Sequence, residues 1–507
     1  MSSSPATISP SPPWTTVWPP ANAPPAGSSP DIPTLRRPGE GGHTMTRRNA
    51  PTQASMGTIP GRRWLAGHAL KMAEDAFAVM DSARDCGDIA VLWLGPKPAY
   101  VISHPGLIRR LLTAEDKNLD KGPLYENLAQ LIGVSIGTLI GRAHRARRRA
   151  VAPAYVPNVT IMADTAMELA SSWQPGQVYD MATQMRRYSF MVMARTLFAG
   201  AIPPAAEAEF VELLPVALTG IAKYTADPTG VLKRLPTRDN RRIKHALATL
   251  KKITEDGLAN HRNGSGGQGG VLAALIRARD PDTGQPLTAE EIRNEAMVMM
   301  SAGSETVAGV LANACAILAW QPDIARRLHA ETDRVLDELP IVEARLPELE
   351  YAGRVVTEIL RMYPPGALMS RRAIVDLDLG GHRIPAGAAV FFCPYLLHRR
   401  ADLYPDPDRF DPERWLPERA AALPYGAFMP FGAGAHICVG EAIAWQEALI
   451  AVATISKLWQ LRPASDQPPR PVLAPTLGLD AVHVTVVPHP SRRQPFEPEE
   501  TADGDRA

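Results

Sequence analysis

Cysteine is scarce in this chain, and no two cysteines lie close together. Its 507 residues contain four, at widely separated positions. None has the short spacing of a zinc-finger or dithiol redox motif, and a chain of this length does not depend on disulfide staples. The absence of disulfide and zinc-binding patterns favours a location in the reducing cytoplasm. At least one of the cysteines then requires a separate explanation. The four are Cys86, Cys315, Cys393 and Cys438.

The sequence also lacks an excess of either charge. Its 54 Lys and Arg residues face 53 Asp and Glu residues, which gives a formal net charge of +1. Proteins that bind nucleic acids usually carry a large positive excess, so a nucleic acid is not the expected partner. Electrostatic docking, if used, must rely on a local patch.

Residues 1–60 contain no long apolar run. The segment is rich in Pro, Ser, Thr and Ala, and such a composition buries too little apolar surface to offset its ordering entropy. It predicts a disordered leader over 1–60, with no signal sequence and no membrane anchor. Met1, Met45 and Met56 all remain candidate starts. Residues 491–507, which include Glu497, Glu499, Glu500 and Asp503, predict a disordered tail.

Between these ends, the pattern predicts a mainly α structure with small, segregated β-sheets. From Pro105 onward the apolar spacing is mostly helical, and no internal repeat is present. β-Branched runs around tight turns predict hairpins. The expected elements are helical spacing over 64–80, a hairpin over 88–102, a glycine-rich loop over 264–270, a buried helix over 294–320, strands over 376–392 and a last hairpin over 474–487.

The most specific motif surrounds Cys438. It reads Phe431-Gly432-Ala433-Gly434-Ala435-His436-Ile437-Cys438-Val439-Gly440 and precedes a helix predicted from Glu441 to about Leu461. A thiolate ligand must be deprotonated yet shielded, and a helix N-terminus supplies a favourable dipole and free N–H groups. Glycines let the backbone turn sharply beside a flat macrocycle. A lone buried cysteine beside such a turn is usually inert, but coincidence does not explain the complete pattern.

This motif resembles the haem-binding loop of the cytochrome P-450 family, and three further motifs follow the family's order. The resemblance runs from about Trp64 to Val487. It implies one domain over 61–490, where chain length alone would suggest about three. It implies a mainly α fold with haem b between an oxygen-binding helix and the cysteine-loop helix. Cys438 would be the axial iron ligand, with Phe431 and Gly432 against the haem, and its electron donation would favour O–O cleavage.

The oxygen-binding motif is Ala302-Gly303-Ser304-Glu305-Thr306, inside the helix predicted over 294–320. A glycine within a helix costs about 1 kcal/mol relative to alanine, so Gly303 needs a reason. The resemblance implies that Gly303 gives dioxygen room over the iron and that Glu305 and Thr306 relay protons to it. Val307 stands where the family often has a second hydroxyl, which narrows the proton route.

A plainer interpretation of this motif is a helix N-terminus. Ser301 or Ser304 with a nearby acid imitates a capping box. The apolar helical sequence continues on both sides, which argues against it.

Glu358-Ile359-Leu360-Arg361 resembles the family's Glu-x-x-Arg motif. Residues three apart share one helix face, so Glu358 and Arg361 can pair. An isolated pair of this kind usually stabilises little. Pro412-Glu413-Arg414-Trp415 matches another family segment, and the resemblance implies that Arg414 completes a buried structural triad.

The resemblance also assigns partners to the two haem propionates. They are His144 and Arg148, four apart on one helix, with His436 and Arg371. Arg372 is the alternative to Arg371 by one position. Each side chain taken alone would more often be a solvated surface group.

The basic run 142–149 has a second interpretation. Arg142, Arg145, Arg147 and Arg149 form a candidate docking patch for an acidic electron carrier. Because no flavin or iron–sulfur motif is visible, we expect a separate ferredoxin and ferredoxin reductase to supply electrons.

The implied activity is that of a soluble monooxygenase acting on a hydrophobic small molecule. Segments expected to line the pocket are aliphatic, rich in methionine and short of charge, although an ordinary core has the same composition. The sequence is similar to actinobacterial members that include sesquiterpene oxidases of the pentalenene oxygenase type. A terpenoid is therefore preferred, with macrolides, steroids and fatty acids left open. The candidate pocket residues are Met299, Ala302, Leu368 and Met369.

Two rival functions remain at this stage. A haem-thiolate peroxygenase or isomerase would need no electron donor, and retention of Glu305 and Thr306 argues against it. A non-catalytic P-450-like partner protein would tend to lose the cysteine loop, which is intact here.

Overall fold

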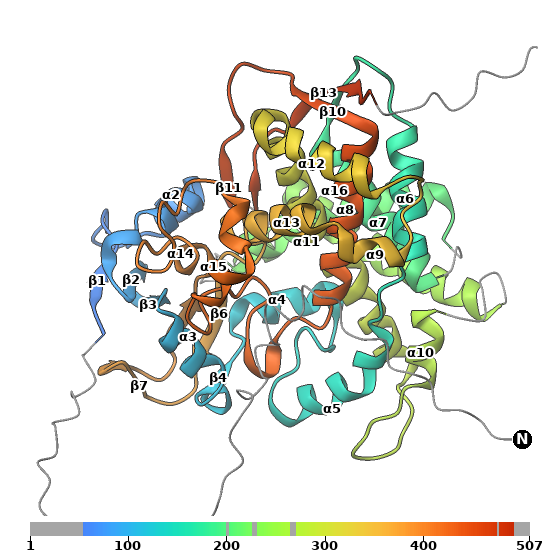
Figure 1. The fold of residues 1–507 in the computed structure, drawn as a ribbon. Coiled ribbons are helices and arrows are strands. Elements are labelled where there is room, and N and C mark those ends of the chain that lie inside the picture. Colours follow the sequence, from blue (N-terminus) through green and yellow to red (C-terminus); the bar gives the residue numbers. More distant parts are fainter. Residues whose placement is uncertain (1–53, 199–201, 226–230, 264–269, 474–475, 491–507) are drawn as a thin grey trace, which may run out of the picture.

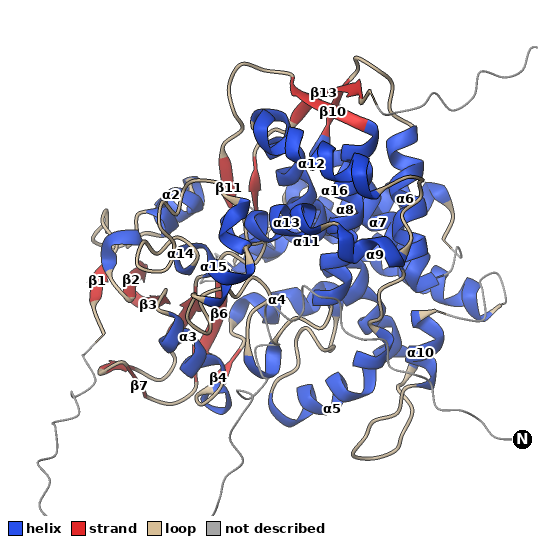
Figure 2. Ribbon diagram, viewed as in Figure 1, coloured by secondary structure: helices blue, strands red, loops and turns tan. Residues whose placement is uncertain are grey.

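A computed structural model describes residues 54–490, except 199–201, 226–230, 264–269 and 474–475. The predicted tail, most of the predicted leader and most of the glycine-rich loop therefore lie outside the described residues. Helices form the main body, with small sheets at its margins (Figures 1 and 2). The mainly α fold class expected from the sequence is confirmed.

The helices account for most of the described residues. Those before the central helix are α1 (Ala69–Glu74), α2 (Ala76–Asp81), α3 (Pro105–Leu112), α4 (Pro123–Ile132), α5 (Gly141–Val151), α6 (Val159–Ser171), α7 (Met181–Phe198), α8 (Pro204–Thr225), α9 (Arg238–Arg262) and α10 (Val271–Arg277). The central helix and those after it are α11 (Ala289–Trp320), α12 (Pro322–Val335), α13 (Glu350–Met362), α14 (Pro394–Leu397), α15 (Pro417–Ala421) and α16 (Glu441–Leu458).

The strands form four sheets. The largest has six strands in the order β1-β2-β3-β9-β6-β4, and the others have the orders β10-β13-β5, β11-β12 and β7-β8. Their bounds are β1 (Met56–Thr58), β2 (Ile89–Leu94), β3 (Lys97–Ile102), β4 (Leu119–Asp120), β5 (Val178–Asp180), β6 (Met369–Ala373), β7 (Leu377–Leu379), β8 (His382–Ile384), β9 (Ala389–Phe392), β10 (Trp459–Pro463), β11 (Pro471–Leu473), β12 (Leu477–Leu479) and β13 (His483–Pro488).

Three predicted boundaries need correction. The domain begins before residue 61, because β1 pairs in parallel with β2. Helical structure starts only at Ala69, since residues 63–67 close a turn through two backbone hydrogen bonds. The last hairpin joins β11 to β12, whereas β13 pairs with β10 and β5. For β1 and β13, pairing with strands distant in sequence decided what the local pattern did not.

The central helix α11 begins where a capping box closes. Thr288 accepts a hydrogen bond from the backbone of Glu291, and the Glu291 carboxylate accepts one from Thr288. The alternative start at Ser301 or Ser304 is therefore wrong. Of the described helices, only α11 is long and apolar enough to span a membrane, and most of its apolar stretch is buried in the fold, as in a core helix.

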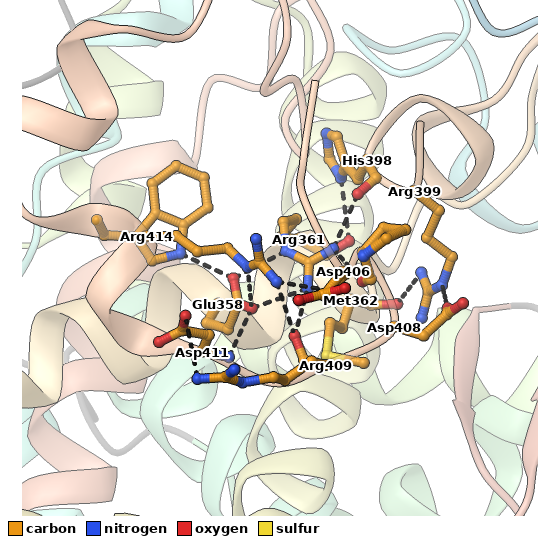
Figure 3. Close-up of polar contacts among 12 residues, drawn as sticks. Glu358, Arg361, Met362, His398, Arg399, Asp406, Asp408, Arg409, Asp411 and Arg414 are labelled. Atoms are coloured by element: carbon orange, nitrogen blue, oxygen red, sulfur yellow. Dashed lines mark hydrogen bonds and ion pairs between the residues drawn. The ribbon is translucent and has the colours of Figure 1, made fainter. Parts of the chain in front are cut away.

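A buried ion pair on α13 anchors the segment that leads to the cysteine loop. Arg361 donates to both carboxylate oxygens of Glu358 at 2.8 Å, and neither side chain has any exposure. Glu358 also accepts from Arg414 at 3.3 Å and from the Trp415 indole at 2.9 Å. Figure 3 shows how this cluster gathers several chain segments around one carboxylate.

The pair reaches the cysteine loop through His398. Arg361 donates to the His398 carbonyl at 2.9 Å, and the His398 ring contacts the Arg361 carbonyl with Nδ1 and the Met429 backbone N–H with Nε2. Burial and the Arg361 charge lower the pKa of His398 to about 3, so the ring is neutral. Nδ1 therefore donates and Nε2 accepts. Met429 in turn accepts from Gly432 of the loop.

We expect Arg361→Met to lower the free energy of unfolding by about 3–5 kcal/mol, because it leaves the Glu358 carboxylate buried without its main partner. Arg326 and Asp323 have the same i, i+3 spacing, but their side chains are 74% and 83% exposed. Arg326→Met should therefore change the free energy by less than about 1 kcal/mol. Denaturant unfolding measures both values, and equal effects of the two substitutions would contradict the proposed role of the triad.

Candidate active site

Cys438 lies deep in the protein and still has accessible surface. Of the four cysteines, all of which the structure describes, Cys438 alone is exposed, although its surroundings desolvate the thiol enough to raise its pKa. These two observations agree if the sulfur faces an internal space instead of packed side chains. The Gly440 backbone N–H opposes the rise in pKa and favours the thiolate.

Two glycines shape the loop before Cys438. Gly432 and Gly434 have φ values of +77° and +71°, which side chains other than glycine rarely adopt. A Cβ atom on Gly434 would also lie 2.1 Å from the Leu112 carbonyl oxygen, so the loop presses against the end of α3. The Cys438 N–H then donates to the Phe431 carbonyl at 2.9 Å. The loop is thus fixed at both ends of the motif.

Basic groups gather beside this loop. The His144 and His436 rings lie 3.9 Å apart, and Nδ1 of each is buried without a hydrogen-bond partner. Arg371 is also buried, where its Nη1 donates only to the neighbouring Ser370 carbonyl. Asp116 lies beside the two histidines, 3.4 Å from His436 Nε2.

The electrostatics of this basic cluster point to a missing negative charge. Burial, followed by the charges of Lys121 and Arg148, lowers the pKa of His144 to about 4. Burial, followed by His144 and Lys121, lowers that of His436 to about 2. A bound carboxylate would relieve this repulsion and satisfy the unpaired nitrogens. The cluster therefore fits the two propionates of haem, with the Cys438 sulfur beside it.

Lys121 is a member of the basic cluster that sequence reasoning missed. It is buried and donates from Nζ to the carbonyls of Gly137 (2.5 Å) and Ile136 (3.3 Å). Burial and the Arg371 charge lower its pKa to about 7. No spacing motif marks it, because strand pairing between β4 and β6 brings it beside Arg371.

Arg371 and Arg372, the two candidates for a propionate partner, lie in different surroundings. Arg372 faces outward and forms ion pairs with Asp120 and Glu126 at 2.8 and 2.9 Å. Arg371 lies in the basic cluster instead. Arg148 has a further contact, since it donates to the carbonyl of Ile437, the residue before Cys438.

On α11, Glu305 and Thr306 lie about one turn after an accessible position of the helix. Thr306 donates to the Ala302 carbonyl at 2.6 Å, and Ala302 is exposed although it lies in a buried helix. One oxygen of Glu305 is buried without a partner. Burial raises the pKa of Glu305, and Arg186 opposes the rise only in part. This carboxyl group therefore holds a proton more tightly than usual.

Gly303 has a packing reason in this structure. A Cβ atom there would lie 2.6 Å from Sδ of Met193 on α7, the helix packed most extensively against α11. The glycine thus permits close approach of the two helices. Its predicted role toward dioxygen stays a prediction.

The predicted pocket residues do not share one environment. Ala302 presents accessible surface, whereas Met299 is buried in the main core. Leu368 packs with Val79 and Met80 beneath the six-stranded sheet, so core packing accounts for it. Met369 lies on β6, with its sulfur close to Gly366.

The predicted docking patch needs one correction. Arg147 is buried and pairs with Glu295 (2.8 Å) and Glu291 of α11, so it does not face a partner. The remaining arginines surround a surface depression of about 560 Å³ next to the cysteine loop. We call this the arginine surface; it comprises Arg142, Arg145 and Arg149, with Asp282 bound to Arg142 (3.2 Å) and Arg149 (2.7 Å).

Comparison with known proteins agrees with this geometry. Residues 58–485 match the family model "Cytochrome P450". The chain is 36% identical over 427 residues to cyclooctat-9-en-7-ol 5-monooxygenase of Streptomyces melanosporofaciens, covering 83% of this chain and 93% of that protein. It is 35% identical to cyclooctatin synthase of the same organism, with 85% and 95% covered. It is also 34% identical to pentalenene oxygenase of Streptomyces avermitilis, with 83% and 94% covered.

Family members bind haem b through a cysteine thiolate, and the relatives include monooxygenases. The match covers the six-stranded sheet, α11, α16 and the loop before it. The chain belongs to the cytochrome P450 family and is a monooxygenase of that family.

Proposed function

We propose that this monooxygenase oxidises a terpenoid, with Cys438 as the axial ligand of haem b. The observation that carries the proposal is the accessible, deeply placed sulfur of Cys438 beside a basic cluster whose two histidines have buried nitrogens without hydrogen-bond partners. Bound haem would supply activation of dioxygen after reduction. The propionates would be held by His144, Arg148, Arg371 and His436, with Lys121 as a further partner.

The proposed proton route uses Glu305 and Thr306. The Thr306 hydroxyl donates to Ala302 and retains lone pairs that can accept a proton from a neighbour. Glu305 precedes it, has an unsatisfied oxygen and binds its proton tightly. Together they are suited to deliver protons inside the site while the apolar core excludes bulk water.

The substrate class rests on the relatives. The name of one contains an unsaturated alcohol and that of another an alkene, so both act on molecules that are mostly hydrocarbon. Shape and apolar contact must hold such a molecule. Accessible Ala302, beside Thr306, is the residue we propose to face it.

We further propose that an acidic ferredoxin, reduced by its reductase in the cytoplasm, docks on the arginine surface. Arg145 is exposed there, and the Cys438 loop contributes Gly434, Ala435 and Ile437 to the same depression. This proximity would give electrons a short path to the sulfur. Asp282 partly neutralises the surface.

Replacing the proposed ligand should abolish the thiolate-type spectrum. Cys438→Ser is expected to lose the reduced carbon-monoxide band typical of haem-thiolate proteins, because serine does not supply the sulfur donor. Cys86→Ser should keep it, since Cys86 is half-buried at the margin of the fold. Absorption spectra of the purified proteins test this, and an unchanged band in Cys438→Ser would refute the ligand assignment.

Replacing the proposed proton carrier should uncouple oxygen use from product. The substrate for this test is a terpenoid that shifts the haem spin state of the wild type when it binds. With it, Thr306→Ala should lower the amount of product formed per NAD(P)H consumed at least about tenfold and raise the yield of hydrogen peroxide correspondingly. Thr306→Ser retains the hydroxyl and should recover much of the coupling. Unchanged coupling in Thr306→Ala would exclude this route.

Charges on the arginine surface should control docking. Asp282→Asn releases Arg142 and Arg149, so the KM for an acidic ferredoxin should fall about threefold at low salt, while Arg145→Glu should raise it by a similar factor or more. Both effects should shrink at high salt. Arg383→Glu on β8 is the control, because its side chain is also exposed. Docking elsewhere is indicated if all three variants behave alike.

A further inference from the structure

A second surface, at the side of the fold where β1, β2 and β3 lie, combines exposed apolar side chains with positive charge (Figure 1). Trp64 is 88% exposed and Leu65 is 73% exposed. Both lie in the turn that Arg63 and Gly67 close, and Gly67 forms a β-bridge with Leu94, itself 38% exposed. We call Trp64, Leu65 and Leu94 the apolar tip. It is formed where two segments of the chain meet, not by one stray side chain.

Cations surround the apolar tip. Arg62 and Arg63 precede Trp64, and Lys97 is the strand partner of Leu94 in the β2–β3 hairpin. Lys71 is close as well, because its Nζ lies 2.8 Å from the Cβ position of Gly61. All four are exposed.

Acidic residues are missing from the two segments that form the tip. Neither residues 54–73 nor residues 89–114 contain an Asp or Glu, and acids resume at Glu74 and Glu115. Within residues 54–490, as far as the structure describes them, none of the four cations forms an ion pair, although Arg62 stacks over the Trp93 ring at 3.6 Å. The surface therefore presents a net positive charge around a hydrophobic centre.

The size of the tip distinguishes between possible occupants. Three side chains expose a few hundred Å² at most, whereas a stable protein interface buries about 800 Å² on each partner. Interfacial membrane anchors need less, because tryptophan and leucine insert at the lipid headgroups while each nearby cation adds attraction to anionic lipid. The composition thus fits a negatively charged bilayer better than a second protein.

From these observations we infer that the apolar tip and its cations bind the surface of an anionic membrane peripherally. This inference does not depend on the proposed substrate, and it goes beyond the proposed function. The β2–β3 hairpin lies at one end of the molecule, away from α5 and the arginine surface (Figure 1). Membrane binding would therefore leave ferredoxin docking free. A hydrocarbon substrate dissolved in the bilayer would then be concentrated near the enzyme.

The test is co-sedimentation of the full-length holoprotein with vesicles of phosphatidylglycerol and phosphatidylcholine, compared with vesicles of phosphatidylcholine alone. The wild type should bind the anionic vesicles preferentially and lose binding at high salt. The variant Trp64→Ser/Leu65→Ser should bind at least about tenfold more weakly. Arg63→Gln/Lys97→Gln should weaken binding about fivefold for each charge removed.

Val342→Ser is the matched control, since Val342 is 59% exposed on a different part of the chain, before α13. It should bind like the wild type, and all variants should retain the reduced carbon-monoxide spectrum. The inference is overturned if wild type ignores anionic vesicles, or if Trp64→Ser/Leu65→Ser binds them as well as Val342→Ser. Self-association that disappears in Trp64→Ser/Leu65→Ser, without vesicle binding, would assign the tip to a second copy of the chain instead.

Discussion

The position of the Cys438 sulfur depends on the buried carboxylate of Glu358. That group has no exposure, so its charge must be matched inside the protein, and Arg361, Arg414, Trp415 and the Asp411 backbone all donate to it. Arg361 also donates to the His398 carbonyl. The His398 ring in turn accepts from the backbone of Met429, in the segment that leads to the cysteine loop. Satisfying one acid on α13 therefore fixes a loop that lies many residues later in sequence.

The basic cluster follows the opposite principle. Around Glu358 every acceptor has a donor, whereas His144 and His436 retain buried nitrogens without a partner. Asp116 faces several cations, among them Arg371, Arg145 and Lys121. Buried cations without enough acidic partners destabilise the protein when no ligand is bound. An anionic ligand removes this destabilisation, which increases its affinity for the site. Arg148 connects the basic cluster to the cysteine loop, because it faces the cluster and also donates to the Ile437 carbonyl.

Motifs formed by neighbouring residues could be predicted from sequence, and contacts between distant elements could not. The cysteine loop, the α11 motif and the Glu358–Arg361 spacing are local, and the structure places the α11 motif within one helix and pairs Glu358 with Arg361. Lys121 and His398 carry no such signal, since β-pairing and a buried ring contact place them. The placement of Arg147 in the docking patch was an avoidable error. Arg147 lies three residues after buried His144, so helical spacing turns its side chain inward as well.

The neutral His398 ring also determines how the loop responds to acid. A solvated histidine takes up a proton near pH 6.5, whereas this one does so only near pH 3. The native contact with Met429 is therefore unchanged by protonation across the neutral range. Below about pH 6.5 the unfolded chain binds a proton that the folded chain refuses, and stability declines as the pH approaches 3. The His398 imidazole thus keeps its contact with the ligand loop unchanged across the neutral pH range. The same imidazole makes the folded protein less stable in acid.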